Sequence, residues 1–105
     1  MKDRPLPIPK SFQLLGHTIT IQYNNEISTE DDKLGKCYLL KDTMVLCDNK
    51  NLNRPQIVTE TTFIHEVLEF IAFHCGIELL RTEEGHRAID LLAEAFVQVW
   101  KTAQL

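Results

Sequence analysis

Residues 59–75 read TETTFIHEVLEFIAFHC, and this stretch decides the fold class. Its apolar side chains recur at spacings of three and four residues, which predicts an amphipathic helix over 59–75. The apolar series consists of Phe63, Ile64, Val67, Leu68, Ile71 and Cys75. Gly76 follows directly and is typical of a helix end, because glycine readily adopts the left-handed conformation found there.

A second helix is predicted over 82–103. Thr82 can cap its first turn, where Glu83 and Glu84 interact favourably with the helix dipole. The apolar stripe predicted for this helix consists of Ile89, Leu92, Ala93, Phe96, Val99, Trp100 and Ala103. The connector over 76–81 is short, so we expect the two helices to be antiparallel neighbours.

The residues before the first helix have the pattern of strands. Apolar and polar side chains alternate over 17–23, which predicts a half-buried strand preceded by a turn at Gly16. Two apolar runs within 35–48 flank a three-residue loop, which favours an antiparallel hairpin. Residues 11–48 are therefore expected to form a small antiparallel sheet of three to four strands. A sheet followed by two packed C-terminal helices is an α+β fold.

The overall composition is that of one globular domain. The chain has 105 residues, and its 44% hydrophobic and 25% charged fractions match ordinary globular usage. No apolar run is long enough to span a membrane. Eleven Lys and Arg residues stand against fifteen Asp and Glu residues without a basic cluster, so nucleic acid is not an expected partner. Three prolines within residues 1–10 predict an extended, loosely held arm.

The cysteines point to a reducing compartment. Cys37, Cys47 and Cys75 are odd in number and lie in apolar surroundings, which argues against a disulfide framework and favours the cytoplasm. Cys37 and Cys47 are expected nearly opposite each other in the hairpin, as buried free thiols. No apolar stretch follows the charged residues within 1–5, so no secretory signal is expected.

The segment His65-Glu66-Val67-Leu68-Glu69 carries the candidate chemistry. Residues four apart lie on one face of a helix, so His65 and Glu69 point the same way and Glu66 lies beside them. An imidazole and a carboxylate so placed can chelate a metal ion, while the adjacent carboxylate accepts a proton from metal-bound water. The competing interpretation is a structural hydrogen bond between His65 and Glu69, which a pair at this spacing makes readily.

A catalytic zinc site takes three protein ligands, so the second helix must supply one of them. It offers His86, Asp90 and Glu94 at steps of four residues. On a helical wheel His86 borders the predicted apolar stripe, Asp90 lies slightly further round, and Glu94 lies almost opposite. This ranks His86 first, Asp90 second and Glu94 third.

The two remaining histidines are given structural roles at this stage. His17 opens a predicted strand and is expected to be exposed. His74 lies near the end of the first helix, where a half-buried histidine interacts favourably with the helix dipole.

Residues 62–71, TFIHEVLEFI, resemble the active-site helix of small phage and prophage proteins related to the ImmA/IrrE-type zincin metallopeptidases. That helix reads T-h-h-H-E-h-h-H-h-h, where h is apolar. Residues 92–99, LAEAFVQV, are similar to the closing helix of these proteins, and the order of elements matches over 11–103. The chain departs from the pattern at Glu69, which stands where the family has its second histidine. The family's third ligand is acidic, which nominates Glu94, whereas here His86 occupies a similar place.

The resemblance implies a minimal zincin-like fold and zinc-dependent hydrolysis of a peptide bond, with Glu66 as the catalytic general base. His65, Glu69 and His86 would supply two imidazoles and one carboxylate as the metal ligands. Two functions stay open: an active metallopeptidase-like hydrolase acting on a protein or peptide, and a catalytically inactive zincin-fold protein that binds a host or phage factor. Either would act in the cytoplasm, that of the host if the chain is phage-encoded. An exposed sheet edge leaves the oligomeric state open.

Overall fold

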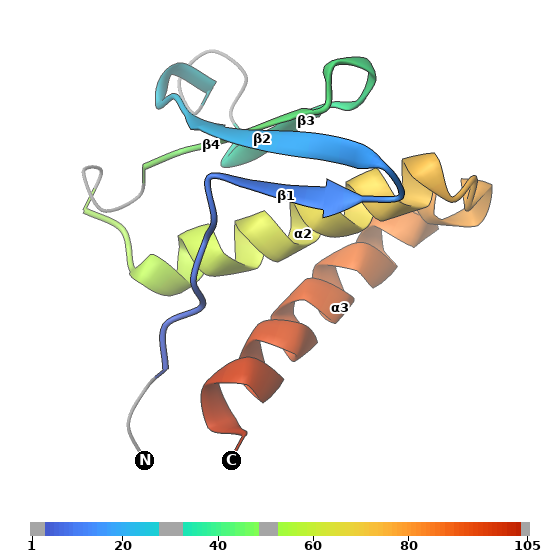
Figure 1. The fold of residues 1–105 in the computed structure, drawn as a ribbon. Helices are drawn as coiled ribbons and strands as arrows, with labels where there is room; N and C mark the ends of the chain where they lie inside the picture. Colours follow the sequence, from blue (N-terminus) through green and yellow to red (C-terminus); the bar gives the residue numbers. More distant parts are fainter. Residues whose placement is uncertain (1–3, 28–32, 49–52, 104–105) are drawn as a thin grey trace.

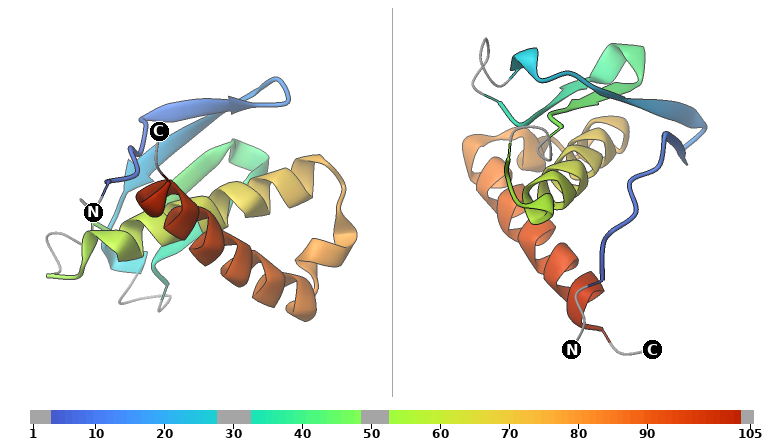
Figure 2. Two further views of the ribbon diagram at one scale, coloured as in Figure 1. Left: turned by 90° about the horizontal axis from the view of Figure 1, so that it is seen from below. Right: turned by 90° about the vertical axis from the view of Figure 1, so that its left-hand side faces the viewer.

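A four-stranded sheet and two helices make up the computed structural model, which describes residues 4–27, 33–48 and 53–103 (Figure 1). The strands and helices are β1 (Ser11–Leu14), β2 (His17–Tyr23), β3 (Gly35–Tyr38), β4 (Thr43–Leu46), α2 (Gln56–His74) and α3 (Glu83–Thr102). Two short 3₁₀ turns, η1 (Leu39–Lys41) and η2 (Glu78–Arg81), lie before β4 and before α3. Figure 2 shows α2 between the sheet and α3, with α3 crossing α2 at an angle. The predicted α+β class, with strands first and two C-terminal helices, is confirmed.

The sheet is mixed rather than wholly antiparallel. Its strand order is β1-β2-β4-β3, in which β1 pairs with β2 and β3 with β4 as antiparallel neighbours, while β2 and β4 run parallel. Both hairpins are local and could be predicted, but the pairing between them is not. We attribute the central place of β4 to its apolar run. Met44, Val45 and Leu46 are all buried, and consecutive apolar residues of this kind are typical of a strand that is covered on both faces of the sheet.

The turns set the register of both hairpins. Leu15 and Gly16 have positive φ values of 50° and 84°, as in the two-residue turns that suit a tight hairpin, so the turn predicted at Gly16 is confirmed. In the second hairpin the chain passes through η1 and a left-handed Asp42 before β4 begins. Cys37 consequently pairs with Met44, and the prediction that it lies opposite Cys47 is wrong.

The two helices begin and end close to the predicted residues. Helix α2 starts at Gln56 rather than at residue 59, directly after Pro55, and the chain turns at a left-handed Gly76. Thr82 caps α3 as predicted, since its hydroxyl accepts a hydrogen bond from the Gly85 amide at 3.1 Å. Among the residues described, no helix combines the length and apolar character that crossing a bilayer requires.

The buried stripe of α3 differs from the predicted one. It consists of Gly85, Ile89, Ala93 and Val97, whereas Leu92, Phe96 and Val99 are 52%, 50% and 64% exposed. Small residues in this stripe allow close approach: a Cβ atom on Gly85 would lie 2.3 Å from the carbonyl oxygen of Leu79. The prediction was centred on Leu92, Phe96 and Val99 as well as Ile89, but the inward face combines the branched Ile89 and Val97 with the small Gly85 and Ala93.

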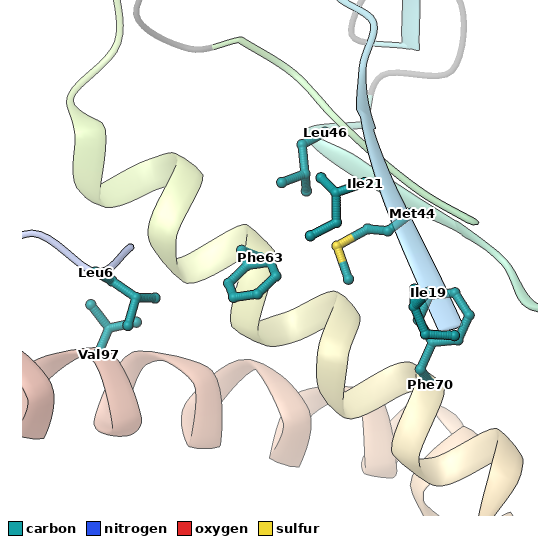
Figure 3. Packing of buried hydrophobic residues seen from close by; sticks show 8 residues of the cluster. All are labelled: Leu6, Ile19, Ile21, Met44, Leu46, Phe63, Phe70 and Val97. Atoms are coloured by element: carbon teal, nitrogen blue, oxygen red, sulfur yellow. The ribbon is translucent and has the colours of Figure 1, made fainter. Parts of the chain in front are cut away.

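The main core lies between the sheet and α2, with α3 closing one end (Figure 3). Phe63 and Phe70 of α2 pack against inward-facing side chains of β2 and β4. Figure 3 also shows Leu6, from the N-terminal arm, beside Val97 of α3. The buried members of this cluster are Leu6, Ile19, Ile21, Met44, Leu46, Phe63, Phe70 and Val97.

The N-terminal arm is extended but fixed, so the prediction of a loosely held arm is wrong. Leu6 is buried, and its amide donates a hydrogen bond of 2.6 Å to Oε2 of the fully buried Glu60. Nζ of Lys101 lies 2.8 Å from the other oxygen, Oε1. The Arg4 guanidinium lies over the Trp100 ring, 4.6 Å from its centre, and its Nε donates to the Trp100 carbonyl oxygen at 3.0 Å. The prolines predict that the arm is extended, but they do not predict its contacts with α2 and α3.

Replacing Lys101 tests this anchor. Lys101→Met should lower the free energy of unfolding by about 3–5 kcal/mol, because it leaves the Glu60 carboxylate buried without a cation. The measurement is urea denaturation of both proteins at the same pH. The matched control is the double variant Glu60→Gln/Lys101→Met, which removes both charges and should recover part of the loss. A double variant no more stable than Lys101→Met would contradict this account.

Candidate metal centre

Helices α2 and α3 bring together the three side chains predicted as metal ligands. His86 Nδ1 lies 2.8 Å and His65 Nε2 lies 3.5 Å from Oε1 of Glu69. One donor atom from each residue lies within 4.8 Å of the other two. Glu69 and His65 are largely buried, while about half of the His86 side chain is exposed. His65 and Glu69, four residues apart on α2, therefore lie next to His86, which is near the start of α3.

The buried Glu69 carboxylate faces two imidazole nitrogens, which carry a positive charge only when they are protonated. Its Oε1 is buried and, among the residues described, makes no hydrogen bond of acceptable geometry despite the two nearby imidazole nitrogens. Burying an unsatisfied charged oxygen is costly, so this point of the structure favours a cation. The cation can be a proton on an imidazole or a metal ion held by all three side chains.

The electrostatic surroundings of His65 point the same way. Its pKa is raised, first by the interaction with Glu69 and further by the charges of Glu66, Asp90 and Glu69, although burial lowers it. Three carboxylates thus act on one imidazole. The negative potential that favours a proton there also favours a divalent cation.

Asp90 holds His65 in place rather than joining the cluster. Its Oδ1 lies 2.7 Å from Nδ1 of His65, which leaves Nε2 directed toward Glu69. A carboxylate behind a histidine is the usual second contact of metal-ligating imidazoles, because it fixes the ring and its tautomer. Asp90 was ranked as the second-choice ligand, and its contact with the far side of the ring was not predicted.

Glu66 lies beside the cluster in a desolvated position. It is 8% exposed, and the Cys37 thiol donates a hydrogen bond of 3.0 Å to its Oε1. Burial raises the pKa of Glu66, while the Cys37 contact and the neighbouring His65 lower it. The pKa of Cys37 is raised strongly, first by burial and then by Glu66, so Cys37 remains a thiol that can donate. A carboxylate with a raised pKa is suited to taking up a proton near neutral pH.

An open cleft of about 640 Å³ exposes these groups to solvent. Its walls include His65, Glu66, Glu69 and His86, with Gly35 and neighbouring residues of β3 opposite them. Gly35 permits this arrangement, because a Cβ atom there would lie 2.5 Å from the Thr62 side chain. Glu94 also lines the cleft, since the flank of α3 that carries His86 and Asp90 faces it, but Glu94 is not one of the clustered donors.

Sequence reasoning missed the role of Cys37. The hairpin pattern indicated an apolar environment for this residue but not which helix would cover it. The contact joins β3 to α2 across 29 positions of the chain, and no local spacing encodes it.

Comparisons with known proteins identify no family for this chain. No protein-family model matches it, and searches of curated proteins and of solved structures returned no significant match. The chemistry of the site therefore rests on the residues themselves.

Removing one donor from α3 tests the ligand assignment. His86→Ala should weaken zinc binding at least about tenfold, or about 1.4 kcal/mol, because it removes one of three donors. Glu94→Ala should weaken it much less. The measurement is a competition titration against a chromophoric zinc chelator. A larger effect of Glu94→Ala than of His86→Ala would reverse the assignment.

A second prediction concerns the residue behind His65. Asp90→Asn should weaken zinc binding by about ten- to a hundredfold, because the ring loses the carboxylate that fixes it. Glu94→Gln is the matched control, since it neutralises a carboxylate one helical turn further along the same cleft. The same titration applies, and equal losses in the two variants would mean that only net charge matters.

Proposed function

We propose that this protein is a zincin-like, zinc-dependent hydrolase in which His65, Glu69 and His86 hold the metal and Glu66 is the general base. The observation that carries the proposal is the convergence of two imidazoles on one buried carboxylate oxygen. Two imidazole nitrogens and one carboxylate are a usual donor set of catalytic zinc sites. The open side of the cleft leaves room for water and substrate at the remaining position.

The residues around the cluster support a hydrolytic role. When bound, the zinc ion would polarise a substrate carbonyl and supply a water that loses its proton near neutral pH. Glu66 lines the same cleft and accepts that proton, and its burial makes it a stronger base than an exposed carboxylate. The Cys37 thiol holds Oε1 of Glu66 and so fixes the orientation of the carboxylate.

A peptide in extended conformation is the substrate that suits this cleft. Strand β3 lines it and stands at the end of the strand order, with β4 on one side and, in the described ranges, no strand on the other. The free edge of a strand can bind an extended peptide as an additional strand through main-chain hydrogen bonds. A peptide so bound would pass in front of Glu66 and the metal ligands.

The alternative function is a catalytically inactive zincin-fold protein that binds a host or phage factor through the same cleft. The observation in its favour is that His65, Glu69, His86 and Asp90 already form a chain of ion pairs joining α2 to α3. Such a network can hold the helices together without a metal. Both proposals are compatible with a reducing cytoplasm, since Cys37, Cys47 and Cys75 are free thiols.

Replacing the proposed base separates the two functions. Glu66→Gln should retain zinc but hydrolyse denatured casein at least about a hundredfold more slowly, because the proton acceptor is lost. The protein is purified without a histidine tag, its zinc content is measured by mass spectrometry, and fragments are followed with time. Glu94→Gln is the control and should keep both zinc and activity.

Two outcomes would contradict the hydrolase. Wild-type protein that holds no zinc after dialysis against the metal would favour the inactive binding protein. Casein cleavage that proceeds equally in wild type and Glu66→Gln would show that Glu66 is not the base.

A further inference from the structure

A second group of metal-ligand side chains lies at the C-terminal end of α2, outside the residues that line the cleft. His17 is the first residue of β2, Asp42 stands between η1 and β4, and His74 is the last residue of α2. Figure 1 shows the turn between β1 and β2 next to this end of α2. Three segments that are distant in sequence therefore place two imidazoles and one carboxylate together.

The geometry of this group matches a shared ligand. Nδ1 of His17 lies 2.9 Å from Oδ2 of Asp42, and Nε2 of His74 lies 3.6 Å from Oδ1 of the same carboxylate. One donor atom from each residue lies within 4.8 Å of the others. Two ligands bound to a tetrahedral zinc ion at about 2.1 Å are themselves about 3.4 Å apart, close to these separations.

The surroundings of His74 Nε2 favour a cation at this point. Nε2 of His74 is buried and, among the residues described, has no hydrogen-bond partner. The His74 side chain is 10% exposed, and 3.6 Å is too long for a hydrogen bond to Asp42. A buried ring nitrogen without a partner costs free energy, which a cation between His74 and Asp42 would offset.

Aromatic neighbours hold the His74 ring in place. The His17 ring stacks on it with the ring centres 4.1 Å apart, and Phe70 lies parallel to it on α2 with the centres 6.1 Å apart. Phe73 meets it edge-on. The nitrogen directed at Asp42 is therefore oriented by packing, as expected of a preformed ligand.

We propose that His17, Asp42 and His74 bind a divalent first-row transition metal ion, such as zinc, as a structural site. Two imidazoles with one carboxylate suit zinc, cobalt or nickel, whereas magnesium and calcium prefer oxygen ligands alone. None of the three belongs to the residues that line the cleft around Glu66, so the site serves the fold. It clamps both hairpins to the end of α2, and it does not depend on the hydrolase proposal.

The test begins with a variant in which the first centre is removed. His65→Ala/His86→Ala should still bind close to one equivalent of zinc, and zinc should raise its melting temperature by mass action. Adding His17→Ala to this variant should weaken the remaining binding at least about tenfold. His17 is the most exposed of the three side chains, so its replacement is the one that the fold tolerates best. Cobalt absorption in the visible range reports the ligand geometry, and magnesium is the control ion.

The outcomes distinguish this site from the cleft. His17→Ala alone should keep the zinc bound in the cleft, whatever happens at the second site. A His65→Ala/His86→Ala variant that binds no zinc would overturn the second site and leave the hydrolase proposal untouched. Unchanged zinc affinity after adding His17→Ala would overturn it equally.

Discussion

The buried carboxylate of Glu60 joins the N-terminal arm, α2 and α3 to one another. Glu60 belongs to α2. Its carboxylate accepts a hydrogen bond from the Leu6 amide of the arm and forms an ion pair with Lys101 of α3. The partners of a buried charge cannot move far, because a lost contact leaves the cost of removing the charge from water uncompensated. Helices α2 and α3 are joined at the other end by η2, so this anchor fixes how they cross.

The crossing of the helices determines what the cleft can do. His65 and Glu69 on α2 meet His86 on α3 only because the two helices lie at a fixed distance in this region. The contact with Glu69 is the main reason that the pKa of His65 is raised, and the negative charges of Glu66 and Asp90 raise it further. The same charges that would repel one another in an open structure become favourable once a cation is present.

Local patterns in the sequence predict much of this arrangement. The spacing of three and four residues identifies both helices, and the pair His65 and Glu69 follows from the helical repeat alone. Thr82 and Gly16 act through their own neighbours, so their roles could be predicted as well. Whatever depends only on residues one turn away is encoded locally.

The rest depends on contacts between distant segments. The parallel pairing of β2 with β4 and the burial of Leu6 have no periodic signal. The inward face of α3 leaves out Leu92, Phe96 and Val99, although these side chains are apolar. The group of His17, Asp42 and His74 spans most of the sheet region and the first helix. A helical wheel treats each helix as isolated and cannot rank such contacts.

The donors of the two centres differ in how far apart they lie in the sequence, and this affects which parts of the fold each centre requires. The donors of the cleft all lie within residues 65–86, so a helical hairpin of α2 and α3 can bring them together before the sheet has formed. The group around His74 needs both β-hairpins docked on α2 and closes long loops, which costs more chain entropy. An ion in the cleft would therefore depend only on the pairing of α2 with α3, whereas an ion at the second centre would depend on both hairpins being docked on α2.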